Sequence, residues 1–173
     1  MKCSAIVIAG LLLAPVGSAS AQGINDAQIA SIVVTANQVD IDAGQLAKAR
    51  SANAEVGKFA ELMITDHTGV NKSATALVTK LKVTPEDNAT SQSLKSGGDA
   101  NLKALKGMKG ASFDKAYIDH EVAYHQAVLD AVDKTLIPGV KNEELKALLV
   151  KVRPAFVAHL EHARHLQSSV GSK

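Results

Sequence analysis

Hydrophobic side chains recur every three or four positions along four separate stretches of the chain. This spacing puts apolar residues on one face of an α-helix and is typical of helices that pack against a core. Residues that cap helix N-termini precede these stretches, and helix-breaking residues follow them. The pattern predicts helices over residues 26–50, 53–82, 112–137 and 142–169.

Residues 83–110 interrupt this pattern with a polar, glycine-rich sequence. A proline followed by two acidic residues predicts a short helix over 85–95. Gly97 and Gly98 predict its end, and a second short helix is expected over 100–106. A connection of this length in a compact domain usually has its own structure or a function. The sequence leaves open a crossover packed on the other helices and a mobile loop.

Four amphipathic helices without any strand pattern predict an all-α fold, a four-helix bundle with a long structured connection between the second and third helices. Ala, Leu and Lys dominate the composition, which favours helix throughout. The connections near residues 51 and 140 are short, so the helices that they join should be antiparallel. The long connection is compatible with either arrangement of the two helix pairs.

The first 21 residues have the pattern of a secretory signal peptide. Lys2 precedes a short apolar run, and the small residues Ala19, Ser20 and Ala21 form a cleavage pattern. The apolar run is too short to span a membrane, and no later stretch is long enough. We expect cleavage after Ala21, a single helical domain over 22–173, and a periplasmic or secreted protein. An uncleaved anchor is the alternative.

The remaining composition excludes several kinds of site. Cys3 is the only cysteine and leaves with the signal peptide, so the mature chain has no disulfide and no thiolate ligand. The chain has 19 basic and 17 acidic residues and no Trp, which gives no electrostatic or stacking basis for binding nucleic acid. No phosphate loop or nucleophile motif is present. We expect a binding protein rather than an enzyme.

Polar residues interrupt the apolar faces near the middle of each predicted helix. Imidazoles with carboxylates suit Zn, Fe, Cu or Ni, and bundle cores commonly hold such sites. Antiparallel helices would bring these mid-helix positions to similar heights. The sequence therefore gives a candidate metal site formed by the inward-facing residues His67, His125, His159, Asp40 and Glu121.

The same residues allow a second interpretation, in which they form a buried polar network without a metal. His125 would then pair with Glu121, and His67 with Asp40, because buried polar groups need partners. Such a protein would have a structural, stress or interaction role in the cell envelope, and the sequence identifies no protein partner. The chain lacks the Glu-x-x-His motif of ferritin-type di-iron sites, which disfavours a di-iron oxidase.

Four segments, DIDAGQLAKARS, VGKFAELMITDHTGVN, FDKAYIDHEVAYHQAVLD and VRPAFVAHLEHAR, resemble one known family. It is the bacterial exported family catalogued as domain of unknown function 4142, and the resemblance covers residues 25–168. It implies a ferritin-like helical fold and export, and no established activity. Asp40 stands where the family usually has Glu. The shared motifs fall on Asp40, Met63, Asp66, His67, Phe113, Asp114, Tyr117, His125, Pro154 and His159.

Overall fold

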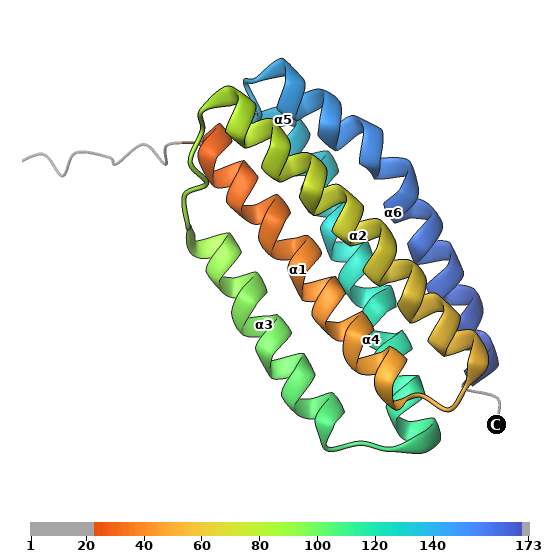
Figure 1. Cartoon of the computed structure of the whole chain (residues 1–173). Coiled ribbons are helices and arrows are strands. Elements are labelled where there is room, and N and C mark those ends of the chain that lie inside the picture. Colours follow the sequence, from red (N-terminus) through yellow and green to blue (C-terminus); the bar gives the residue numbers. More distant parts are fainter. Residues whose placement is uncertain (1–22, 171–173) are drawn as a thin grey trace, which may run out of the picture.

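A computed structural model describes residues 23–170, and every regular element in that range is helical (Figure 1). The all-α prediction is confirmed, whereas the predicted signal peptide lies outside the described residues. None of the described helices is both long and apolar enough to cross a membrane. The elements are α1 (Asp26–Arg50), α2 (Ala54–Leu81), α3 (Ala89–Lys106), α4 (Gly110–Ala131), a π-helical turn η1 (Val132–Leu136), α5 (Ile137–Gly139) and α6 (Glu143–Val170).

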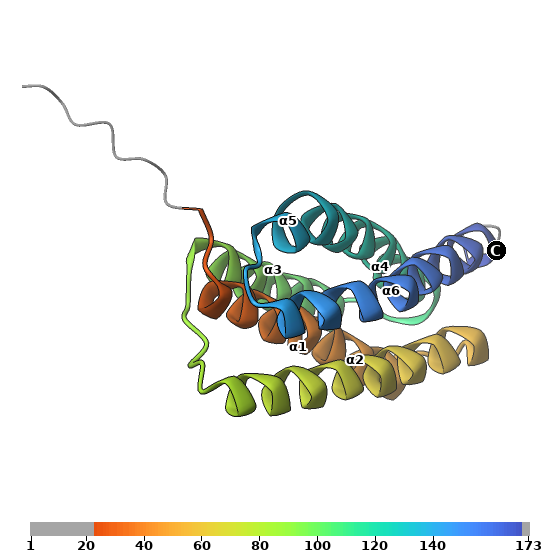
Figure 2. The ribbon, with the colours of Figure 1, turned by 90° about the horizontal axis from the view of Figure 1, so that it is seen from above.

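Helices α1, α2, α4 and α6 form a four-helix arrangement. Helix α1 packs against α2, α4 packs against α6, and α2 also contacts α6 (Figures 1 and 2). The pairs α1/α2 and α4/α6 are antiparallel, as their short connections predicted. Helix α3 returns the chain along the length of the bundle, so α2 and α4 run in the same direction.

Asparagine side chains cap the starts of α1, α2 and α6. Asn25 accepts a hydrogen bond from the backbone N–H of Gln28, whose side chain in turn accepts from the backbone N–H of Asn25. Asn53 and Asn142 likewise accept from backbone N–H groups in the first turns of α2 and α6. These bonds satisfy donors that have no partner within the helix. The predicted starts of these helices near residues 26, 53 and 142 are confirmed.

The third predicted helix differs from the expectation at both ends. Helix α4 begins at Gly110, two residues before the predicted start at Ser112, whose hydroxyl donates to the carbonyl of Lys109. Asp114 lies inside the helix and is buried. At the other end the helical path continues through η1 to Gly139. The sequence pattern did not indicate this π-helical turn.

The prediction of two short helices in the connection is wrong, because α3 is one continuous helix. Gly98 does not break it but lies buried against α1, where a Cβ atom would be 2.8 Å from Cγ2 of Val39. The glycine therefore allows the two helices to approach closely, and its helix-breaking tendency is outweighed by packing. Asn88, rather than the region of Pro85, caps α3. The connection is a packed crossover.

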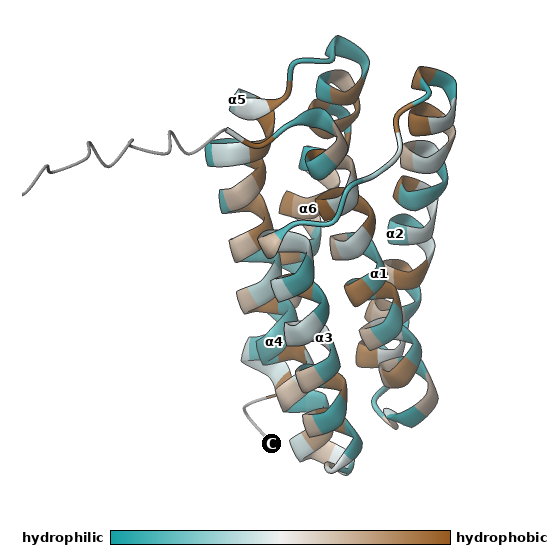
Figure 3. Cartoon of the chain, turned by 90° about the vertical axis from the view of Figure 1, so that its left-hand side faces the viewer, coloured by the Kyte–Doolittle hydropathy of each residue, from teal (hydrophilic) through white to brown (hydrophobic). Residues whose placement is uncertain are grey.

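The core consists of two large hydrophobic clusters at opposite ends of the bundle. One cluster contains Phe59, Met63, Phe113 and Tyr117, and the other is centred on residues from the start of α1, on η1 and on the start of α6. Figure 3 shows hydrophobic and hydrophilic residues alternating around each helix, as expected for helices with one apolar face. Between the two clusters lies a layer of buried polar side chains.

The close approach at Gly98 leads to a prediction about stability. Gly98→Ala should destabilise the protein by about 1–3 kcal/mol, because Val39 has a stiff side chain and the added methyl group would overlap it. Gly97→Ala is the matched control: a Cβ atom there meets nothing within 4 Å, so alanine should stabilise the helix by about 0.5–1 kcal/mol. Urea unfolding measures both. Equal stability of the two variants would contradict the packing described here.

Candidate metal centre

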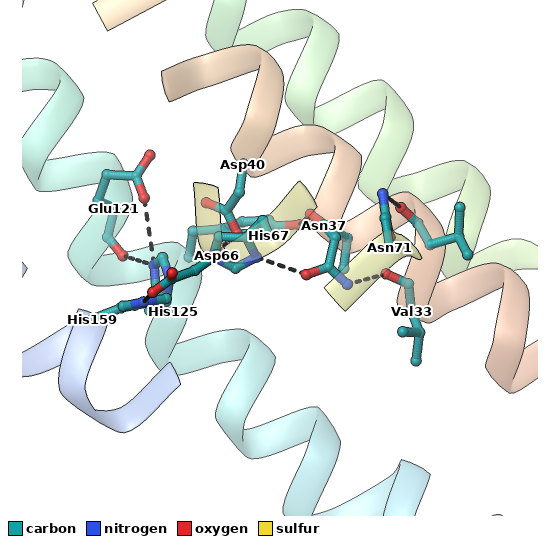
Figure 4. Close-up of polar contacts among 12 residues, drawn as sticks. Val33, Asn37, Asp40, Asp66, His67, Asn71, Glu121, His125 and His159 are labelled. Atoms are coloured by element: carbon teal, nitrogen blue, oxygen red, sulfur yellow. Dashed lines mark hydrogen bonds and ion pairs between the residues drawn. The ribbon is translucent and has the colours of Figure 1, made fainter. Parts of the chain in front are cut away.

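All five predicted site residues meet in the polar layer between the two clusters. Each main helix of the bundle contributes: Asp40 from α1, His67 from α2, Glu121 and His125 from α4, and His159 from α6 (Figure 4). Each lies on the inward row of its helix, and none is more than 3% exposed. The mid-helix positions therefore lie at the same height, as the antiparallel pairing predicted.

The three imidazole rings form a triangle. Their ring centroids are 5.2–5.6 Å apart, and one ring nitrogen from each histidine lies within 4.8 Å of the other two. Burial lowers the pKa of His67 to about 3 and also lowers the pKa of His125. These two rings are therefore neutral near pH 7, and a neutral imidazole has a lone pair available for a cation.

A hydrogen bond that His67 donates to Asn37 on α1 orients the ring of His67. Its Nδ1 lies 2.7 Å from Oδ1 of Asn37, and Nδ2 of Asn37 donates to the carbonyl of Val33 at 2.7 Å. A carbonyl can only accept, so this second bond fixes the amide of Asn37 with its oxygen toward His67. His67 must then donate from Nδ1, which leaves the lone pair on Nε2.

The other two histidines are oriented in the same way. His125 donates from Nδ1 to the backbone carbonyl of Glu121 at 3.0 Å, and His159 donates from Nε2 to a carboxylate oxygen of Asp66 at 2.9 Å. The remaining nitrogens, Nε2 of His67, Nε2 of His125 and Nδ1 of His159, are buried without a hydrogen bond. Metal-binding histidines usually have one ring N–H held by such an acceptor and the other nitrogen free.

Two carboxyl groups adjoin the histidines. Oδ2 of Asp40 is 3.5 Å from Nε2 of His67, and Oε2 of Glu121 is 3.4 Å from Nδ1 of His125. Asp40, Glu121 and His125 also form a group whose ligand atoms lie within 4.8 Å of one another. Burial raises the pKa of Asp40, and burial together with the nearby Asp40 raises the pKa of Glu121 well above its usual value. Burial therefore favours the protonated form of the Glu121 carboxyl.

The pairs expected in a metal-free network are present but incomplete. His67 faces Asp40 and His125 faces Glu121. The protonated carboxyl of Glu121 can donate one hydrogen bond to Asp40, but the three ring nitrogens are buried acceptors without a donor. Their number distinguishes this layer from an ordinary buried polar network, in which nearly all such atoms are paired.

Sequence reasoning missed three residues that support or adjoin the site. Asn37 lies three positions before Asp40 on the same face of α1, and Tyr117 lies four positions before Glu121, so helical spacing could have identified both. Burial and the nearby carboxyl groups raise the pKa of Tyr117, whose hydroxyl is buried without a partner. Asp66 belongs to the motif around His67, but its link to His159 on α6 depends on tertiary packing.

The fold and this polar layer define a helical bundle with a buried histidine and carboxylate centre. A family model described as Domain of unknown function (DUF4142) matches residues 13–166, and the chain belongs to this family. The resemblance noted in the sequence is thereby confirmed. No curated protein and no solved structure matched the chain.

The buried histidines predict a pH dependence of stability. The pKa of His67 is about 3 in the folded protein and about 6.5 when unfolded, so between these values the unfolded chain binds the extra proton. Stability contributed by the neutral ring is therefore lost as pH falls below about 6.5. From pH 7 to pH 5, wild-type protein with chelator should lose about 1–2 kcal/mol more unfolding free energy than His67→Gln. The control His165→Gln changes a histidine on the exposed face of α6 and should lose as much unfolding free energy as the wild type. Equal losses in the wild type and in His67→Gln would contradict the prediction.

Proposed function

We propose that this protein is exported to the periplasm or secreted and there holds one transition-metal ion in the core of the bundle. His67, His125 and His159 are the ligands, and Asp40 or Glu121 completes the set. One observation carries the proposal: three ring nitrogens from three helices converge without hydrogen bonds, while the opposite nitrogen of each ring is held by an acceptor. The role is metal handling rather than a reaction.

The energetic argument concerns the unsatisfied acceptors. A buried polar atom without a hydrogen bond costs about 1–3 kcal/mol, and this layer has three ring nitrogens and several carboxyl oxygens in that state. The three ring nitrogens are all acceptors and cannot hydrogen-bond to one another, whereas the protonated carboxyl of Glu121 can donate one hydrogen bond to Asp40. A single cation provides a partner for all of them at once. A polar network without metal leaves the three ring nitrogens unpaired, which disfavours the structural alternative.

The donor set favours one ion over two. The three-histidine group and the Asp40/Glu121 group share His125. Nδ1 of His125 is engaged with the carbonyl of Glu121, so only Nε2 can bind a metal. One nitrogen cannot serve two separate ions, and the two groups therefore describe alternative parts of a single coordination sphere.

The ligand chemistry limits the choice of metal to Zn, Fe, Cu or Ni. Imidazole with carboxylate suits these ions, and the chain supplies no thiolate in residues 23–170. The raised pKa of Glu121 adds a further property, because a cation replaces the proton of a carboxyl group that binds it. Metal binding through Glu121 should release a proton.

Elemental analysis of untagged mature protein tests the proposal. We expect about one ion per chain in the wild type, and loss of that ion in His67→Ala, His125→Ala and His159→Ala, since removing any one ligand opens the shared site. His165→Ala is the matched control on the surface of α6 and should retain the metal. Absence of metal after exposure to Zn, Cu, Fe and Ni would refute the site, and would leave a structural envelope protein with a buried polar network.

Export is tested by expressing the complete chain in a bacterium and sequencing the N-terminus of the protein in the extracytoplasmic fraction. The mature protein should begin at Gln22, because Ala19 and Ala21 provide the small residues that cleavage requires. Ala21→Phe should accumulate uncleaved precursor. Wild-type protein that stays in the cytoplasm with its first residues intact would contradict this part of the proposal.

A further inference from the structure

The candidate metal centre is closed to solvent, so a cation has no open path to it. The free ring nitrogens of His67, His125 and His159 have almost no accessible surface. None of these three side chains is more than 3% exposed. Filling or emptying the site therefore requires that at least one of the ligand side chains moves.

One of the three rings is linked to the surface by its hydrogen bond. Nε2 of His159 on α6 donates at 2.9 Å to Oδ2 of Asp66 on α2, and the side chain of Asp66 is 39% exposed (Figure 4). The acceptors for the other two rings, Asn37 and the backbone carbonyl of Glu121, belong to buried residues. Asp66 is therefore the one acceptor of the three that reaches solvent.

This difference decides which ring turns at the lowest cost. If His67 or His125 turned, a buried acceptor would lose its donor and no water would replace it, which is unfavourable. If His159 turned, water would hydrate the carboxylate of Asp66 in place of the lost N–H. The side of the His159 ring that carries Nε2 already faces this exposed residue. His159 is therefore the ligand that moves most readily.

Asp66 also has the charge to attract a cation. Within residues 23–170 the ion pairs of lysine and arginine involve other carboxylates, so no basic side chain neutralises Asp66. Behind its carboxylate lies the free Nδ1 of His159, which is buried and has no hydrogen-bond partner. An exposed, unneutralised carboxylate thus lies in contact with a buried ligand.

We propose that Asp66 and His159 form the point at which the metal ion enters and leaves the bundle, between α2 and α6. The carboxylate of Asp66 takes the cation from solvent, and the ring of His159 turns over to offer Nδ1 to it. Both groups are then acceptors, so the outward ring is stable only while a cation lies between them. When the ring turns back, Nδ1 brings the cation toward His67, whose ring centroid is 5.2 Å from that of His159.

This inference rests on the proposed function and adds the route by which the site exchanges its ion. Stopped-flow mixing of metal-free mature protein with Zn²⁺, or with the ion that elemental analysis identifies, measures the loading rate through a metal-responsive dye. Asp66→Asn removes the charge but keeps an oxygen that accepts from Nε2 of His159. This variant should load about tenfold more slowly than the wild type. Release into excess chelator should also slow, because release follows the same path.

Two further variants separate this role from a general effect of charge. Asp66→Glu keeps the charge and should load faster than Asp66→Asn. Glu61→Gln is the matched control, because it removes one negative charge from an exposed position on the same helix, and it should load as fast as the wild type. Loading of the wild type should fall more steeply with salt than loading of Asp66→Asn. Thermal unfolding establishes that all variants are folded.

The outcomes distinguish the route from the site itself. If Asp66 only orients His159, Asp66→Asn should release the ion faster than the wild type, because a ligand is held less firmly. Faster release, or loading of Asp66→Asn at the wild-type rate, would overturn the inference and leave the metal site in place. Failure of the wild type to take up any of Zn, Cu, Fe and Ni would refute the proposed function, and the route with it.

Discussion

The dehydration of ionisable side chains is the constraint on which this structure depends. Two hydrophobic clusters enclose the polar layer from both ends of the bundle, so three imidazoles and two carboxyl groups are removed from water. Burial penalises their charged forms, and the rings of His67 and His125 and the carboxyl of Glu121 respond by remaining neutral. The same burial that makes the layer costly also makes its lone pairs available, because neutral imidazoles cannot repel a cation and water cannot compete for it.

The orientation of the histidine rings depends on how the helices pack against one another. Asn37 on α1 holds the ring of His67 on α2, and Asp66 on α2 holds the ring of His159 on α6. Only His125 is oriented within its own helix, by the carbonyl of Glu121. A shift of α1 or α6 along the bundle would break these bonds and turn the rings, so side chains next to the site fix its geometry as firmly as the ligands do.

Much of this arrangement could be predicted from the sequence, since it depends on local rules. Asparagine caps and apolar spacing located three helix starts, and the inward rows located every candidate ligand. The missing parts depend on contacts between distant residues. Gly98 was expected to end a helix, and only its contact with Val39 explains why α3 continues. Which nitrogen is free in His67 and in His159 follows from Asn37 and Asp66, which contact these rings from other helices. No spacing rule contains that information.

The crossover through α3 divides the bundle into two helical hairpins, α1 with α2 and α4 with α6. The first hairpin carries Asp40 and His67, and the second carries Glu121, His125 and His159. Each hairpin consists of contacts that are local in sequence and fast to form, whereas the polar layer is complete only after the two hairpins dock. The histidine triangle therefore spans both hairpins, and a lone hairpin has at most two of its three ring nitrogens. A full set of ligands exists only where the two hairpins are packed together.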